Sequence, residues 1–134
     1  MRAVLDPNVV ISGLLSSAGI PAQVLRAWRE GRFEAVVSRL LLAELERALA
    51  YPKLRKRIPP EDATAAIRFL QAGATVVDDP TRPPPTHSED PGDDYLIALA
   101  AEQRAALVSG DRHLLALAPR IPVYAPRDFL DLLR

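Results

Sequence analysis

The stretch Met1–Leu15, MRAVLDPNVVISGLL, decides the fold. Ala3–Leu5 is a short apolar run with the length and residue types of a buried strand. Asp6 ends the run, and Pro7 suits the first position of a helix, where its missing N–H has no partner to lose. A carboxylate therefore lies where a buried strand turns into a helix. Such an acid is either a helix N-cap or a site residue, because open α/β sheets bind ligands at the carboxyl ends of their strands.

The composition is that of one globular domain. The chain has 134 residues, of which 49% are hydrophobic, so it can bury a full core and is not a disordered chain. No apolar run approaches the roughly 18 residues of a membrane span, and Asp6 and Asn8 interrupt any stretch resembling a signal peptide. The chain has no Cys, which excludes disulfides and thiolate metal sites. We expect a single cytoplasmic domain over residues 1–134.

The charge is balanced, with 17 Lys and Arg against 17 Asp and Glu. Net charge therefore gives no sign of nucleic-acid binding, and local patches or metal ions would have to attract an RNA. One dense basic cluster is present, formed by Lys53, Arg55, Lys56 and Arg57. This basic cluster is either a solvated surface or a contact for RNA or a partner.

Apolar patterns predict strands that alternate with helices. Further strands are expected at 33–37, 74–77, 105–109 and 121–124. Helices are expected after Asp6 and at about 21–31, 39–50, 59–72, 94–101, 114–117 and from 126 onward. Because strands and helices alternate, the sheet should be mostly parallel with helices on both faces. The predicted fold class is α/β, a three-layer αβα sandwich around a four- to five-stranded sheet.

Two residues that could be functional, Trp28 and His87, have simpler structural explanations. Trp28 shares a helical face with Val24, so we expect it to anchor the core. His87 lies in the irregular segment 78–92, and we expect it to be solvated because no partner is nearby at the spacing of a metal ligand. Long loops of this kind are often functional or mobile.

Acidic residues recur at the ends of the predicted strands. Asp6 follows the first strand, and Asp111 follows the strand at 105–109. Asp94 begins the helix that precedes this strand and lies on the apolar face of that helix. An unpaired charge on an apolar face is costly. Asp90 and Asp93 have a simpler explanation, because acids in the first turn of a helix interact favourably with its dipole.

Each of these acids can be a cap, but together they indicate a metal site. We expect the acids at the ends of parallel strands to meet at one edge of the sheet. Two such charges ~5 Å apart repel by ~3 kcal/mol at an effective dielectric constant of about 20. A fold would hardly gather them without a cation, and Mg²⁺ and Mn²⁺ prefer such oxygen ligands. We favour a divalent metal site over separate caps.

Four stretches also resemble a known family: Val4–Leu15, Ser38–Leu45, Asp90–Ala100 and Leu107–Asp111. The resemblance extends over nearly the whole chain. In this order and at this spacing the four stretches resemble the PIN domain, most of all the VapC-like toxin ribonucleases of prokaryotic toxin–antitoxin pairs. The resemblance implies an endoribonuclease that depends on Mg²⁺ or Mn²⁺ and cleaves single-stranded regions of RNA.

The resemblance also implies four acids that hold one or two metal ions. The first acid of the family matches Asp6, and the third and fourth match Asp94 and Asp111. Helical geometry alone leaves Glu44 and Glu46 open as the second acid, and the resemblance implies Glu44.

Supporting residues follow from the same motifs. Ser109 matches the hydroxyl residue just before the last acid, and Asn8 matches the polar residue after the first. Both would orient water and ligands around the metal. Asp90 and Asp93 lie close enough to Asp94 for one of them to share its role.

One position departs from the family pattern. The family usually has Thr or Ser where this chain has Pro7, so a hydroxyl and a backbone donor are missing beside the expected metal site. The alternative to a nuclease is therefore a non-catalytic PIN-like module that binds RNA or an antitoxin. An aspartyl-phosphate enzyme or receiver domain is disfavoured, because it needs a lysine near the phosphate and the two lysines, Lys53 and Lys56, lie in the basic cluster.

Partners follow from the resemblance and from apolar surface. The resemblance suggests a cognate antitoxin protein and a homodimer. The apolar faces at 21–28 and 61–70 could supply more nonpolar area than one small domain hides, which also favours a homodimer.

Overall fold

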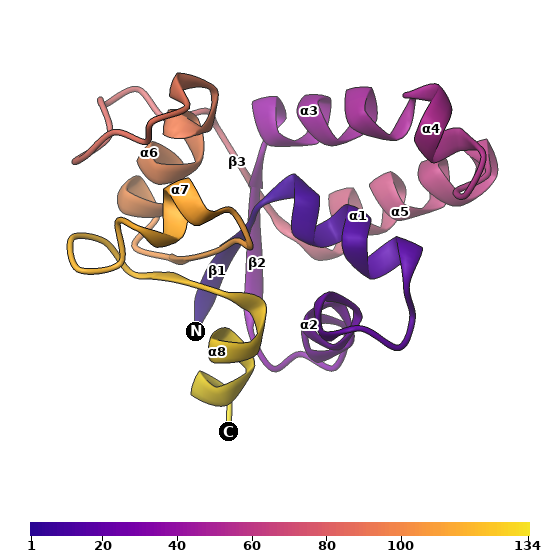
Figure 1. Ribbon diagram of the computed structural model, residues 1–134, viewed down its shortest axis with the longest axis horizontal. Coiled ribbons are helices and arrows are strands. Elements are labelled where there is room, and N and C mark those ends of the chain that lie inside the picture. The colour runs from indigo at the N-terminus through magenta and orange to yellow at the C-terminus, as the bar shows by residue number, and fades with distance from the viewer.

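The computed structural model describes residues 1–134 as a five-stranded, all-parallel sheet flanked by helices (Figure 1). This confirms the predicted α/β class. The strand order is β3-β2-β1-β4-β5, so the first strand lies at the centre. The strands are β1 (Arg2–Leu5), β2 (Glu34–Ser38), β3 (Thr75–Val77), β4 (Ala106–Val108) and β5 (Val123–Tyr124).

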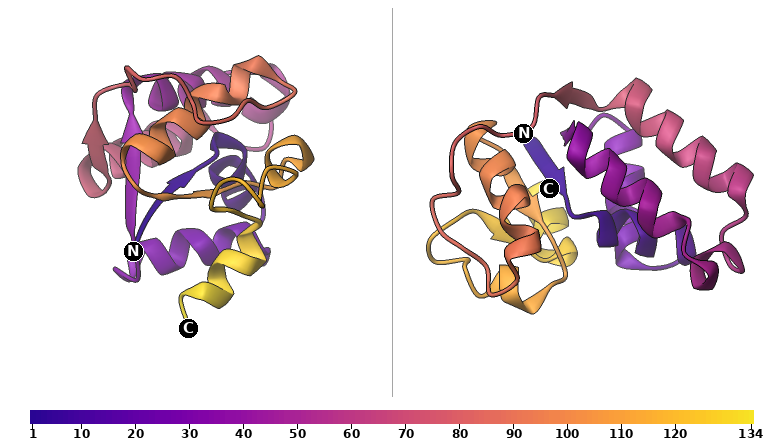
Figure 2. Two further views of the ribbon diagram at one scale, coloured as in Figure 1. Left: turned by 90° about the vertical axis from the view of Figure 1, so that its left-hand side faces the viewer. Right: turned by 90° about the horizontal axis from the view of Figure 1, so that it is seen from above.

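Helices lie on both sides of the sheet. The helices are α1 (Pro7–Leu15), α2 (Ile20–Arg29), α3 (Arg39–Leu49), α4 (Pro52–Arg55), α5 (Pro60–Gly73), α6 (Asp94–Glu102), α7 (Arg112–Leu115) and α8 (Pro126–Leu132), with a 3₁₀ turn, η1 (Pro91–Asp93), before α6. Figures 1 and 2 show α1 to α5 gathered on one side, with α6 and α7 on the other. The last helix, α8, contacts α2 and β5. Between β3 and η1 the chain runs without regular structure, as expected for this segment.

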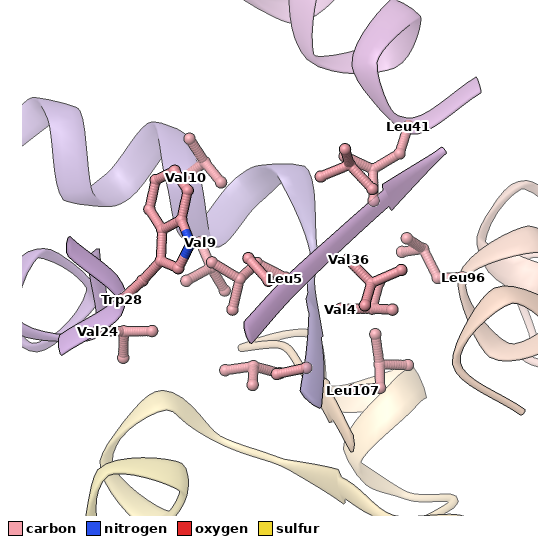
Figure 3. Close-up of a cluster of buried hydrophobic side chains, with 14 of the residues drawn as sticks. Val4, Leu5, Val9, Val10, Val24, Trp28, Val36, Leu41, Leu96 and Leu107 are labelled. Atoms are coloured by element: carbon pink, nitrogen blue, oxygen red, sulfur yellow. The ribbon is translucent and has the colours of Figure 1, made fainter. Parts of the chain in front are cut away.

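The core forms where alternate residues of the central strands meet the two helical layers. Val4 and Leu5 are both buried, and they point to opposite sides of β1 as successive strand residues do. Figure 3 shows Leu5 on the side of Val9 and Trp28, and Val4 on the side of Leu96. Burial on both faces explains why β1 is a continuous apolar run rather than an alternating one.

Two expectations about the core are informative. Trp28 is buried as predicted, and its ring meets the Phe69 ring edge-on at 5.1 Å between centroids. The last strand is shorter than predicted, because Ile121 and Pro122 lie outside it. Pro122 has no N–H to donate, and it joins the sheet only through its carbonyl, which accepts from the Leu107 N–H at 2.9 Å.

The helices are short. No single helix has the length and apolar character needed to span a membrane, and only α1 and α2 taken together, across a bend of 103°, pass that test by length and composition.

Candidate active site

Asp6 lies at the carboxyl end of the central strand. Its N–H donates to the Val108 carbonyl at 2.9 Å, which extends the pairing of β1 with β4 by one residue. Asp6 Oδ1 accepts from the Asn8 N–H at 3.0 Å and so caps α1, while Oδ2 accepts from the Ser109 hydroxyl at 2.8 Å. The side chain is buried, with 4% of the residue exposed. Asp6 is therefore an N-cap and also a buried acid at the edge of the sheet.

Ser109 connects the ends of the two neighbouring strands. It is fully buried after β4, and its hydroxyl oxygen accepts from the Asp111 N–H at 3.0 Å while donating to Asp6. Asp111 Oδ1 in turn accepts from the His113 N–H at 2.8 Å and caps α7. The cap uses one carboxylate oxygen of Asp111, which leaves the other for a ligand.

Asp93 completes this group of acids. Burial raises the pKa of Asp93 to about 7, helped by its hydrogen-bonding contact with Asp111 and by the charges of Asp6, Asp90 and Asp111. Asp93 Oδ2 is buried and has no hydrogen-bond partner. The structure therefore brings Asp93 together with Asp6 and Asp111, and we call these three residues the acid edge.

Asp94, the acid that the resemblance implies, points elsewhere. Its Oδ1 accepts from the Ser88 N–H at 2.8 Å, and its Oδ2 lies 2.7 Å from His87 Nδ1. The hydrogen bond from His87 is the main reason that the pKa of Asp94 is lowered. A helix turns by about 100° per residue, so adjacent acids face different directions, and here Asp93 is the one that faces Asp6. Asp94 instead holds the preceding segment.

His87 is solvated as expected, with 70% of its side chain exposed, and it pairs with Asp94. Its partner Asp94 lies seven residues later, across η1, which is not a spacing that helix or strand periodicity indicates. A second exposed pair joins His113 Nδ1 to Glu89 Oε2 at 3.0 Å. The two histidines thus tie the segment 78–90 to α6 and α7.

The two candidates for the second acid lie in different surroundings. Glu44 on α3 is half-exposed and forms a 3.9 Å ion pair with Arg47. Its charge is the first after burial among the causes that raise the pKa of Tyr95. Glu46 instead lines a hollow of about 330 Å³ between α3 and α5, together with Arg55. Of the two acids, Glu44 is the one whose charge acts on Tyr95, the same residue on which the charges of Asp6 and Asp93 act.

Tyr95 is a residue that the sequence analysis missed. Its hydroxyl is buried without a hydrogen-bond partner, and burial and the charges of Glu44, Asp6 and Asp93 raise its pKa. The available signal was its place directly after the paired acids at the start of α6. A buried, unpaired hydroxyl among carboxylates is a donor that a ligand or water can use.

The remaining supporting residues lie around this group. Asp90 caps η1, with its Oδ1 accepting from the Gly92 N–H at 2.9 Å, and its charge adds to the raised pKa of Asp93. Asn8 donates its backbone N–H to Asp6, while its side chain lines a hollow beside Asp111. Pro7 is buried at the first position of α1, as its missing N–H allows.

The electrostatics of the acid edge favour a cation. Burial is the main cause of the raised pKa of Asp6, and the charge of Asp111 adds to it, against the hydrogen bonds from Asn8 and Ser109. No three Asp, Glu or His side chains lie close enough together to form a complete metal-ligand set. Mg²⁺, however, usually keeps several waters and binds through one or two carboxylates. The unpaired Asp93 Oδ2, with the Asp111 carboxylate beside it, fits such a hydrated ion.

The basic cluster is separate from the acid edge. Lys53, Arg55, Lys56 and Arg57 are all exposed, at and just after α4. The 11 residues of α3 lie between the carboxyl end of β2 and this cluster, a helix length of roughly 16 Å.

The family model of the PIN domain matches residues 2–113. The chain belongs to the PIN-domain family. This family has a nuclease fold and is typically dependent on divalent metals. The chain is 30% identical over 142 residues to an uncharacterized protein, MJ1680, of Methanocaldococcus jannaschii, an alignment that covers 98% of this chain and 90% of that protein.

Solved PIN-like structures share the fold. The PilT N-terminus domain protein SSO1118 from the hyperthermophilic archaeon Sulfolobus solfataricus P2 superposes with a TM-score of 0.57 and 17% identity, over 99% of this chain and 93% of that one. The PIN domain of human SMG5 gives a TM-score of 0.54 and 15% identity over the whole of both chains. At these identities the likeness shows the fold alone.

Proposed function

We propose that this PIN domain is a Mg²⁺- or Mn²⁺-dependent endoribonuclease that cleaves single-stranded regions of RNA in the cytoplasm. The observation that carries the proposal is the acid edge, where Asp93 has a buried carboxylate oxygen without a partner and lies beside Asp6 and Asp111. Carboxylates whose pKa values are raised by burial and by one another gain most from a bound cation.

A hydrated metal ion would be held among Asp6, Asp93 and Asp111, and the charge of Glu44 acts on the neighbouring Tyr95. A bound divalent ion polarises the scissile phosphate and lowers the pKa of the attacking water. Ser109 keeps Asp6 in place by donating to Oδ2 and fixes Asp111 through its backbone N–H. The buried Tyr95 hydroxyl is placed to orient a water or a phosphate oxygen.

Asp94 takes a different role in this proposal from the one the resemblance implies. Its oxygens contact Ser88 and His87 rather than the acid edge, and its pKa is lowered rather than raised. We assign Asp94 as a positioning residue that fixes the start of α6, so that Asp93 faces Asp6.

The direct test is cleavage of a mixed RNA pool with Mn²⁺, with Mg²⁺ and with EDTA. We expect cutting with either metal and none with EDTA. The alternative, a non-catalytic PIN-like module, rests on Pro7, which removes the family's hydroxyl beside the site. RNA binding without cutting under any metal would favour that alternative, and cutting in EDTA would exclude the metal mechanism.

A homodimer is supported by apolar surface on one face of the molecule. Leu14 and Phe69 are 37% and 51% exposed and, with Leu25 and Trp28, line a hollow of about 360 Å³ where α1 and α2 meet α5. A second copy would bury this surface. We expect light scattering to show a dimer at micromolar concentration and Phe69→Ser to shift it toward monomer. A wild-type monomer throughout that range would exclude the dimer.

The toxin role rests on the resemblance of the four motifs to VapC-like ribonucleases. It predicts a cognate antitoxin, encoded beside this chain, that binds the protein and suppresses cleavage. Co-expression with the product of the adjacent reading frame tests it. A stable complex with reduced RNA cleavage is the expected result, and full cleavage in the presence of that product would count against a toxin–antitoxin pair.

A further inference from the structure

A small hollow of about 350 Å³ adjoins Asp111. One wall is the exposed side of α1, with Asn8 and Ser12, and the Gly110–Asp111 turn forms another. Pro21 and Pro126, near the starts of α2 and α8, complete it. The volume is at the lower end of the range for small-molecule sites. The hollow thus suits one ring-sized group rather than a helix or a duplex.

The side chains of Asn8 and Ser12 are available to form hydrogen bonds with a ligand in the hollow. Asn8 and Ser12 are four residues apart on α1, so their side chains share a face of the helix. Within the protein, Asn8 donates its backbone N–H to Asp6 and Ser12 uses its backbone carbonyl to accept from Ser16. Both side chains are exposed. An amide and a hydroxyl together offer donors and acceptors, as the edge of a nucleobase does.

The charge of the lining favours the base of a nucleotide over its phosphate as the group that enters the hollow. Asp111 is the one charged residue in its lining, and it is negative. The lining therefore has no positive side chain to attract a phosphate, and an uncharged base needs none. The two proline rings give apolar walls against which a flat ring can pack. Proteins that read RNA sequence do so mostly on unstacked bases of single strands, which can enter such a hollow.

We propose that this hollow is a subsite that receives one unstacked nucleobase of the RNA, next to the phosphate that is cut, and that Asn8 and Ser12 select the base. The inference rests on the proposed ribonuclease function and adds a sequence preference to it. It places base recognition on α1, beside the acid edge and away from the basic cluster.

Gly110 allows the hollow to be narrowed without disturbing the fold. A Cβ added at Gly110 would meet no heavy atom of the protein within 4 Å, and its backbone is not in the left-handed region. Gly110→Ala therefore adds a methyl group to a residue of the lining without a clash. Ser12→Ala removes a hydroxyl from the hollow, and Ser16→Ala, at the C-cap of α1, is the control outside it.

The first measurement is a titration of the protein with each of the four ribonucleosides in EDTA, in which binding is detected by shifts of the backbone amide NMR signals. Nucleosides carry no phosphate, so their binding does not depend on a metal. We expect shifts at the Ser12 and Gly110 amides that differ among the four bases, are lost in Gly110→Ala and persist in Ser16→Ala.

The second measurement is the base preference beside each cut when a randomised RNA pool is cleaved with Mn²⁺. Loss of one neutral hydrogen bond should reduce the preference in Ser12→Ala by about three- to tenfold, with no change in Ser16→Ala. Cutting with the same preference in wild type, Ser12→Ala and Gly110→Ala, and no nucleoside shifts at the hollow, would overturn the subsite and leave the ribonuclease intact. Nucleoside binding at the hollow with no cutting under any metal would support the subsite and remove the ribonuclease.

Discussion

Two neighbouring regions of this PIN domain treat their carboxylates in opposite ways. At the acid edge, burial dominates and raises the pKa values of Asp6 and Asp93. Where the segment 78–90 meets α6, hydrogen bonds from His87 and Ser88 lower the pKa of Asp94. Asp93 and Asp94 are adjacent in the chain, so position in the sequence does not set the difference. The acids with raised pKa values gain from a cation, whereas hydrogen bonds from His87 and Ser88 already stabilise the charged form of Asp94.

The two regions also differ in how they are held. The acid edge is joined by the buried Ser109 hydroxyl, which contacts both Asp6 and Asp111. The segment 78–90 is held by pairs that water reaches, since His87 is 70% exposed and Glu89 is 82% exposed. Exposed ion pairs contribute little to stability. The acid edge is therefore the fixed part of the site and the segment 78–90 the more easily displaced one.

The largest expected effect separates the two adjacent acids. Asp93→Asn removes a proposed metal ligand and should lower Mn²⁺-dependent RNA cleavage by about 10²- to 10³-fold, on the scale of losing a group that stabilises the transition state. Asp94→Asn keeps the side-chain shape and should cost about tenfold or less. Initial rates at saturating Mn²⁺ measure both. Equal losses, or a larger loss for Asp94→Asn, would reverse the assignment.

Metal binding to the acid edge should appear as thermal stability. A ligand that binds only the folded state stabilises it, by about 2.7 kcal/mol at a hundredfold excess over Kd. Mn²⁺ should therefore raise the Tm of wild type, and Asp6→Asn should reduce the gain, while Asp94→Asn retains most of it. An equal shift in wild type and in Asp6→Asn would count against a metal site at Asp6.

Without metal, Asp93 and Asp94 should make the stability of the protein depend on pH in opposite directions. The folded-state pKa of Asp93 is about 7, above the ordinary 3.8, so its contribution to stability is fully present below about pH 4 and lost as pH rises toward 7. For Asp94 the pKa is lowered, so its contribution is present above the ordinary value and lost as pH falls through the lowered one.

Urea unfolding in EDTA between pH 4 and 7.5 measures the first of these trends. The free energy of unfolding of wild type should include a decline with pH that is absent from Asp93→Asn. Parallel pH profiles for wild type and Asp93→Asn would show that Asp93 has no raised pKa.

The basic cluster should affect binding and not the chemical step. Arg55→Ala together with Arg57→Ala removes two exposed cations, and each phosphate contact releases counterions on binding. RNA binding should weaken, and the slope of log K against log salt should fall in magnitude by about 1.4 for single-stranded RNA. Filter binding at several salt concentrations measures this, and an unchanged slope would mean that the cluster is only a solvated surface.

The smallest expected effect concerns Pro7. Pro7→Thr restores the family's hydroxyl and a backbone donor at the start of α1. We expect cleavage to be preserved or raised by a few fold at most, because the acid edge itself is unchanged. A large loss of cleavage with the fold intact would show that this site needs the proline.

Local chemistry made much of this arrangement predictable. Asp6 and Asp111 could be placed at strand ends because the apolar runs before them and their capping roles are local features. The choice between Asp93 and Asp94 could not be made, because it depends on η1 turning the chain just before α6 and on His87 meeting Asp94 from outside the helix. Both acids satisfy the same motif, so only the folded structure separates them.

The role of Tyr95 and the hollow beside Asp111 could not be predicted from the sequence for a similar reason. The Tyr95 hydroxyl is buried, and the acids whose charges further raise its pKa, Glu44, Asp6, Asp93 and Asp79, come from separate parts of the chain. The hollow brings together residues near the starts of α1, α2 and α8. Sequence patterns indicate which face of an element is apolar, but not which polar residues of distant elements converge.

The most direct test of the metal-dependent nuclease is the rate of Mn²⁺-dependent RNA cleavage by wild type, Asp6→Ala, Asp111→Ala and the double variant, with folding checked by circular dichroism. Acids that hold one metal act as a unit, so their losses do not add. We predict that each single variant nearly abolishes cleavage and that the double variant is scarcely worse than either. Cleavage that survives the loss of both Asp6 and Asp111 in the folded protein would contradict a metal centre at the acid edge.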